Sequence, residues 1–126
     1  MSLNEVMLIG RLGADPEIRY TQDGKPVATF RIATNRYWNE DGERKEKTDW
    51  HRIVAWNRLA EIAGEYLEKG RLVYVEGRLE TRSWEDQDGI KRWVTEIIAR
   101  DIQMLDSRGG EKADTSEPPT DEDPPF

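Results

Sequence analysis

The sequence predicts a small all-β domain with one helix, followed by an acidic tail. Apolar and polar residues alternate with a period of two over several segments of residues 1–108. The period changes to that of a helix only at Arg58–Lys69. Residues 109–126 contain no aromatic side chain before Phe126 and hold four of the chain's six prolines. We therefore expect one folded domain at 1–108 and a disordered tail at 109–126.

The charge and the composition exclude several classes of protein. The net charge of −7 lies mostly in residues 109–126, which carry one lysine against six acidic residues. No apolar run approaches the ~18–20 residues that a membrane helix needs, and the N-terminus lacks the layout of a signal peptide. The chain has no cysteine, and His51 is its single histidine. We expect a cytoplasmic protein without a metal or another cofactor.

The first strand is expected over Val6–Leu12, where residues of both parities are apolar. A strand exposed on one face would alternate, so we expect this one to be covered on both sides, with another subunit as a candidate for the second cover. Turn signals follow at 13–16 and at 23–24. Clear alternation then predicts a second strand over Val27–Thr34.

A loop, a third strand and the helix come next. Residues 39–47 have no apolar member and are expected to form an exposed loop, after which the strand pattern resumes over Thr48–Trp56. In the helix Arg58–Lys69, apolar residues recur at i, i+3, i+4, i+7 and i+8. Asn57 is its expected N-cap, and Gly70 is expected to take the left-handed conformation at its end.

The last two strands are expected over Leu72–Trp84 and Lys91–Leu105, joined by a turn at 86–89. The element order is then strand, strand, strand, helix, strand, strand. This is the order of the OB-fold, a five-stranded, partly open Greek-key barrel with a helix between strands 3 and 4. Other small α+β domains share the order, so the side-chain pattern has to support the assignment.

Tryptophan and arginine alternate on one face of the third strand. A period of two places Trp50, Arg52 and Trp56 together. Ile53 and Ala55 lie on the other face and can fill the interior of a small barrel. The two indoles and the guanidinium between them are then expected to face outward.

The fourth strand repeats this pattern with Arg82 and Trp84 on its less apolar face. Nucleobases of any identity stack on indole rings at about 1–3 kcal/mol per base, while basic side chains neutralise the phosphates. The pattern therefore favours binding of a single-stranded nucleic acid. The alternative is that the tryptophans plug the barrel or fill an interface. Trp38 suits a clamp or an ordinary surface position, and the parity of Trp93 leaves its role open.

No catalytic motif accompanies these residues. The sequence has no glycine-rich phosphate loop, no GxSxG turn and no spacing of metal ligands, so we expect no enzyme. His51 has the parity of an interior or interface residue, and we expect it to be packed and hydrogen-bonded.

The tail closes with an acidic run and a terminal aromatic residue after two prolines. These residues are Asp121, Glu122, Asp123, Pro124, Pro125 and Phe126. Such a tip suits capture by a partner with an apolar pocket and a basic rim. The alternative is a tail that only solvates the protein.

Several long motifs follow one another in a specific order: GRLGADPEIRY (10–20), TDWHRIVAW (48–56), EYLEKGRLVYVEGRLETRSW (65–84) and the closing DEDPPF. With these motifs, the chain resembles the bacterial single-stranded DNA-binding proteins over Leu3–Asp106. The resemblance implies an OB-fold homotetramer that binds single-stranded DNA without sequence preference. It also implies a nucleoid-associated protein that coats and protects this DNA in replication, recombination and repair.

The resemblance further implies roles for individual residues. Base-stacking positions of the family are matched by Trp38, Trp50, Trp56 and Trp84. Positions along the DNA backbone are matched by Arg52, Arg58, Lys69 and Arg82. Subunit contacts are expected at Val6, Leu8, His51 and Tyr74. The tip at Asp121–Phe126 is expected to recruit replication and repair enzymes. The chain departs from the family at Glu68 and Glu80, where relatives often have basic residues, and at Pro124, where they have an aliphatic one.

Two other functions compete with DNA binding. An OB-fold of this composition also suits RNA, structured or single-stranded. Alternatively, the chain is an oligomeric scaffold in which tryptophans fill the interfaces and only the tail binds partners.

Overall fold

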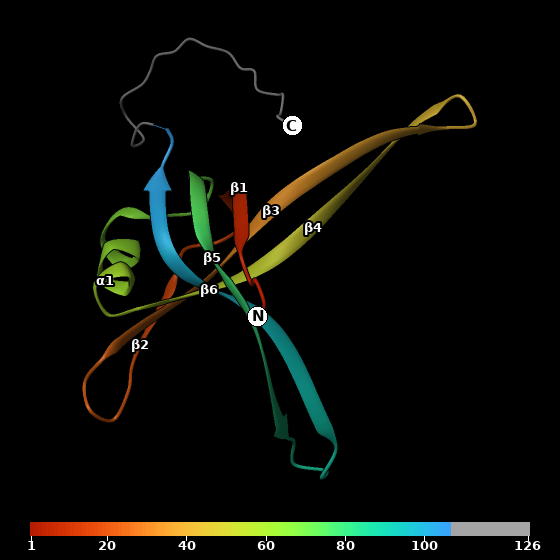
Figure 1. The fold of residues 1–126 in the computed structure, drawn as a ribbon. Coiled ribbons are helices and arrows are strands. Elements are labelled where there is room, and N and C mark those ends of the chain that lie inside the picture. The colour runs from red at the N-terminus through yellow and green to blue at the C-terminus, as the bar shows by residue number, and fades with distance from the viewer. Residues whose placement is uncertain (107–126) are drawn as a thin grey trace.

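The computed structural model describes residues 1–106, which form six strands and one helix (Figure 1). The elements are β1 (Val6–Leu12), β2 (Glu17–Tyr20), β3 (Pro26–Glu40), β4 (Glu43–Trp56), α1 (Asn57–Tyr66), β5 (Leu72–Glu85) and β6 (Lys91–Met104). The predicted domain boundary at 108 and the predicted tail at 109–126 lie outside the described residues.

Five strands close into a barrel. The sheet has the order β1-β5-β6-β4-β3-β2, and β1 also pairs with β3. The pairing of β1 with β3 includes two residue pairs, and β4 and β6 pair in parallel through Ile53–Ile97 and Val54–Ile98. The short β2 pairs with the first four residues of β3, Pro26–Thr29, and is not one of the five barrel strands. The predicted OB-fold, with its helix between the third and fourth barrel strands, is confirmed.

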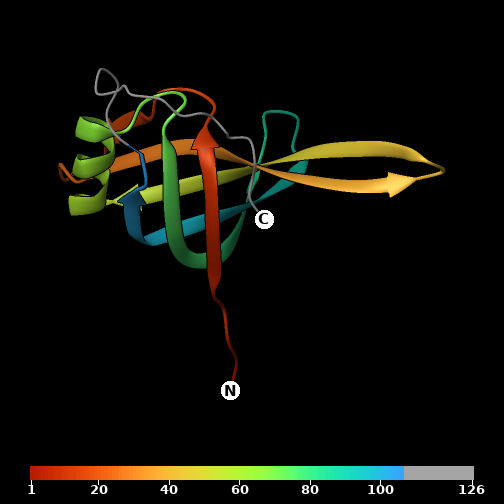
Figure 2. The same cartoon turned by 90° about the horizontal axis from the view of Figure 1, so that it is seen from above.

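The core lies inside the barrel and under α1. Its largest fully buried side chains are Ile32, Ile53, Val73 and Val75. The helix adds Ala60 and Ala63, three residues apart on one face, together with Leu67 just beyond its end. Figure 2 shows α1 on one side of the barrel and the long hairpin formed by β3 and β4 projecting on the opposite side. Within residues 1–106, no helix has the length and apolar character that crossing a membrane requires.

The prediction of a loop at 39–47 is wrong. There β3 and β4 continue as a paired two-stranded ribbon that projects from the barrel (Figure 1). The ribbon turns at Asp41 and Gly42, whose φ angles of 53° and 77° are typical of the tight turns that match strand twist. Both faces of this ribbon meet solvent, so its sequence carries no apolar alternation that would reveal a strand.

The helix also differs from the prediction at both ends. It spans Asn57–Tyr66 and stops short of Lys69. Asn57 does not cap it through its side chain; instead Asn57 has a φ of 55° and turns the chain from β4 into the helix. Gly70 is left-handed as expected, with φ of 88°, but it lies in the turn before β5 and not at the helix end.

A bulge at Arg100 of β6, opposite Glu76 and Gly77 of β5, interrupts the pairing of these two strands. The pairing of β5 with β6 shifts register between Glu76 and Gly77. A Cβ atom on Gly77 would collide with the backbone carbonyl of Ile98. Beyond the bulge, β5 and β6 continue as a second projecting hairpin (Figure 1). Glycine is therefore required where the two backbones approach most closely.

Gly77→Ala is expected to lower the free energy of unfolding by about 1–3 kcal/mol, because the carbonyl of Ile98 cannot move without disturbing the sheet. Urea denaturation followed by tryptophan fluorescence measures this loss. Gly64→Ala is the matched control. In α1 its Cβ would meet no backbone atom, only Cδ1 and Cγ1 of the Ile18 side chain at 3.1 and 3.2 Å, and the variant gains up to about 1 kcal/mol of helix propensity. Equal stabilities of the two variants would contradict the role given to Gly77.

Candidate nucleic-acid interface

The outer face of β4 presents two indole rings with a guanidinium between them. Trp50 and Trp56 are 55% and 42% exposed, whereas Ile53 and Ala55 on the opposite face are fully buried. Arg52 lies between the two rings and is half-buried. The alternation that the sequence predicts along this strand is therefore present, and neither ring is sealed inside the barrel.

Strands β6 and β5 continue this face. Val54 of β4 lies beside Ile98 of β6, and Glu96, two residues before Ile98, lies directly opposite Glu80 of β5. Side chains that face one another across paired strands share one side of the sheet. Residues of one parity on the three strands therefore form a single surface, in which the predicted Arg52 and Arg82 come close together.

An open groove of about 290 Å³ lies in this surface. Val54 and Ile98 contribute apolar lining, and Trp56 contributes an indole. Arg52 and Arg82 line the same groove. The groove thus combines a flat aromatic ring with cationic donors, which is what stacking on bases and pairing with phosphates require.

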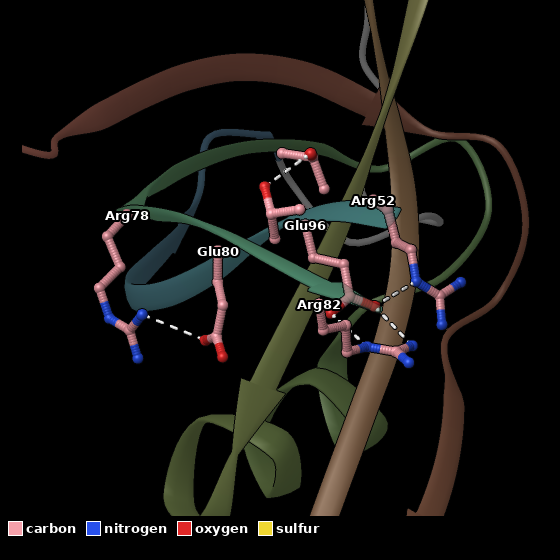
Figure 3. Close-up of polar contacts among 7 residues, drawn as sticks. Arg52, Arg78, Glu80, Arg82 and Glu96 are labelled. Atoms are coloured by element: carbon pink, nitrogen blue, oxygen red, sulfur yellow. Dashed lines mark hydrogen bonds and ion pairs between the residues drawn. The ribbon is translucent and has the colours of Figure 1, made fainter. Parts of the chain in front are cut away.

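Glu96 connects the two arginines (Figure 3). Its side chain is 5% exposed. It accepts a hydrogen bond of 2.7 Å from Nε of Arg52, and bonds of 3.1 and 3.2 Å from Nε and Nη2 of Arg82. Burial opposes ionisation of Glu96, but the hydrogen bonds from both arginines outweigh it and hold the pKa of Glu96 below the usual range. The hydrogen bond with Glu96 also raises the pKa of Arg82.

Glu80 faces Glu96 in the register but has a different partner. Arg78 Nη1 donates to Glu80 at 3.1 Å, and Figure 3 shows this pair turned away from the Glu96 cluster. Two carboxylates directly opposite one another would repel. Here Arg52, Arg78 and Arg82 outnumber them, so this part of the surface has a local net charge of +1.

The predicted Trp84 lies next to this cluster, whereas Trp93 does not. The guanidinium of Arg82 is 5.5 Å from the centroid of the Trp84 ring. Trp93 pairs with Ser83, the neighbour of Trp84, and therefore faces the other side of the β5–β6 hairpin. It is 63% exposed, and Lys91 Nζ is 5.6 Å from the centroid of its ring. Trp93 therefore lies on the face of this hairpin that is opposite to Trp84.

The β3–β4 ribbon carries Trp38 and an aromatic residue that sequence analysis missed. Trp38 has the opposite parity to the residue that pairs with Trp50, so it lies on the other face of the ribbon. Tyr37 shares the parity of the Trp50 face and is exposed, with the Arg44 guanidinium 4.6 Å from its ring centroid. Because 39–47 were predicted to be a loop, the pairing that places Tyr37 could not be recognised.

Two predicted basic residues lie outside the groove. Arg58 is in the first turn of α1, where its Nη1 is 3.4 Å from Glu61. Lys69 lies between α1 and β5, where its backbone N–H donates to Asp15 at 2.9 Å. Neither residue lines the groove or bonds to the Glu96 cluster. Their assignment to a DNA path stays a prediction.

The predicted subunit contacts on β1 and β5 differ in which side of the sheet they face. Val6 and Leu8 are partly buried against the barrel's own core, whereas Met7 and Ile9, of the other parity, are exposed. Tyr74 lies opposite Ile9. Its hydroxyl donates to Glu76 at 3.2 Å, and burial, followed by this bond, raises the pKa of Tyr74. The exposed apolar side of β1 is therefore the face of Met7 and Ile9.

His51 is half-buried and bonded, as the sequence leads us to expect. Its Nε2 is 2.8 Å from the Oγ1 of Thr34 on the neighbouring strand. Its place in a subunit interface stays a prediction. Among residues 1–106, no three histidine, aspartate or glutamate side chains gather into a group able to hold a metal ion.

Glu96→Gln is expected to destabilise the domain at neutral pH by about 1–3 kcal/mol, because it removes charge-assisted hydrogen bonds. Since the pKa of Glu96 is lowered on folding, the contribution of its carboxylate is present above the ordinary glutamate pKa of about 4.3 and is lost as the pH falls below it. The difference between wild type and variant should therefore shrink toward pH 3, as measured by urea denaturation. A difference that is constant between pH 7 and pH 3 would contradict this account.

Comparisons with known proteins agree with this geometry. A model of the Single-strand binding protein family matches residues 3–105. The chain is 51% identical over 117 residues to "Single-stranded DNA-binding protein 1" of Xylella fastidiosa, covering 91% of this chain and 83% of that protein. It is 51% identical over 109 residues to "Single-stranded DNA-binding protein" of Neisseria meningitidis serogroup A, covering 86% of this chain. The chain spans 63% of that relative's length.

A solved structure shares the fold. It is the "Plasmodium falciparum SSB complex with ssDNA", which superposes with a TM-score of 0.79 at 44% identity. The match covers 84% of this chain and 97% of that one. From the matched family model, the identities and the shared barrel, the chain belongs to the single-strand binding protein family.

Proposed function

We propose that this protein binds single-stranded DNA without marked sequence preference and has no catalytic role. The observation that carries the proposal is the exposed Trp50–Arg52–Trp56 face of β4. Stacking on an indole does not depend on which base is presented, and an arginine contacts the phosphate that every nucleotide shares. The names of the relatives, and the single-stranded DNA in the Plasmodium complex, support the same ligand.

The finer role is coating and protecting single-stranded DNA during replication, recombination and repair, inside the cytoplasm and associated with the nucleoid. Recruitment of replication and repair enzymes is assigned to the tip at Asp121–Phe126. The tip lies outside the described residues, so this part rests on its sequence: acidic residues followed by two prolines and a phenylalanine.

The working form proposed is a homotetramer. Support comes from β1, which pairs with β5 along Val6–Arg11, while its pairing with β3 includes only Arg11 and Leu12 in the register. Along most of β1 the second edge is therefore left for another strand, and an open edge is a ready site for pairing with a second chain. Met7 and Ile9 add exposed apolar surface beside it.

Excess oligo(dT) is expected to quench the tryptophan fluorescence, with Trp50→Ala and Trp56→Ala each weakening binding about 5- to 150-fold, as the stacking energy of about 1–3 kcal/mol implies. Affinity should fall with salt by about 0.7 log units per phosphate contact per log unit of salt. Trp93→Ala, an exposed tryptophan on the other side of the β5–β6 hairpin, is the matched control. Unchanged fluorescence at low salt, or tighter binding of a matched RNA, would contradict the proposal.

Ile9→Asp is expected to shift the tetramer toward smaller species, because it places a charge on the apolar face of β1. Sedimentation equilibrium measures the mass of wild type and variant. Leu3→Asp, at an exposed apolar position before β1, is the control and should keep the wild-type mass. A wild-type protein that sediments as a monomer would contradict the tetramer.

A further inference from the structure

Glu96 is a carboxylate in a groove for which we propose a polyanionic ligand. It lies on β6, and it contacts Arg52 of β4 and Arg82 of β5. At 5% exposure it is one of the two charged residues that are buried within residues 1–106. A negative charge at this place opposes phosphate binding unless it has another effect on the groove.

The contacts of Glu96 leave specific donors free. Arg52 is bonded only through Nε among the described residues, so both of its Nη groups are without a partner. Arg82 uses Nε and Nη2, which leaves Nη1. The side chains of Arg52 and Arg82 are 33% and 51% exposed, so the free donors can meet solvent or a ligand.

The two guanidinium groups also lie beside each other. Both donate to the same oxygen of Glu96, Oε2. Figure 3 shows both guanidinium groups on the same side of that carboxylate. Without Glu96, two cations at this separation would repel and adopt many conformations. With it, the three side chains form a fixed cluster of net charge +1.

We propose that Glu96 is a positioning residue that holds Arg52 and Arg82 as a preformed seat for one phosphate of the bound strand. The inference rests on the proposed function. The seat adjoins Trp56, which lines the same groove, and Trp84, whose ring lies under Arg82. A phosphate held here would place bases within reach of indoles on both sides. Because the arginines are immobilised in advance, binding loses less side-chain entropy.

Glu80 provides a matched control for charge. It lies directly opposite Glu96, lines the same groove and carries the same charge, but it bonds to Arg78 and to neither arginine of the seat. Replacing either glutamate by glutamine removes one negative charge from the groove. Only Glu96→Gln also releases Arg52 and Arg82.

The experiment compares the affinity of wild type, Glu80→Gln and Glu96→Gln for oligo(dT) by fluorescence titration at two salt concentrations. Glu80→Gln is expected to bind more tightly than wild type, most clearly at low salt. Glu96→Gln is expected to bind about tenfold more weakly than Glu80→Gln, since two arginines must then be ordered by the ligand. Equal affinities of the two variants, or a tighter Glu96→Gln, would overturn the inference.

Binding by wild type and by Glu80→Gln tests the proposed function in the same titrations. If both bind and Glu96→Gln equals Glu80→Gln, only the positioning role fails. If wild type shows no binding to oligo(dT) at low salt, the proposed function fails, and this inference fails with it.

Three further variants test the positioning role. Arg82→Lys keeps the charge at a half-exposed site but replaces the two nitrogens that bond to Glu96 by a single one, so it should lose affinity. In a background of Arg52→Gln with Arg82→Gln, the affinity difference between the two glutamate variants should disappear. An affinity of Arg82→Lys equal to wild type, or a difference that persists in that background, would overturn the role of Glu96.

Discussion

The two-residue period of β4 is the constraint on which the rest of the molecule depends. The barrel is narrow, and its interior accepts Ile53 and Ala55 from this strand. With these two residues inside, the pleat fixes Trp50 and Trp56 on the outer face. The side chains that would bind a nucleic acid therefore cannot turn inward without emptying the core. The packing of the core and the exposure of the candidate interface therefore both follow from the alternation of inward and outward residues along β4.

Electrostatics then explains how an acidic chain presents a surface suited to an anion. The overall charge of −7 includes the six acidic residues of 109–126. On the groove, Arg52, Arg78 and Arg82 exceed Glu80 and Glu96 by one. Local arrangement therefore matters more than the total. The ion pairs of these arginines with Glu80 and Glu96 keep this surface only weakly positive.

The sequence predicted what apolar periodicity records and missed what depends on long-range pairing. The alternation of β4 and the element order were enough for the barrel. The ribbon at 39–47 was missed because neither of its faces is apolar, and with it the place of Tyr37. Glu96 was missed because its partner Arg52 is 44 residues away in sequence. On β1, where both parities are apolar, pattern alone could not tell inward Leu8 from outward Ile9.

The closure of the barrel between β4 and β6 has a mechanical consequence. These strands pair in parallel through Ile53–Ile97 and Val54–Ile98, so few backbone bonds hold this seam. The groove lies across this β4–β6 seam, with Arg52 contributed by β4 and Glu96 by β6. A ligand bound in the groove would contact both β4 and β6 and so add interactions across the seam. Local opening of the seam, and with it amide exchange at Ile97 and Ile98, thereby becomes coupled to occupancy of the groove.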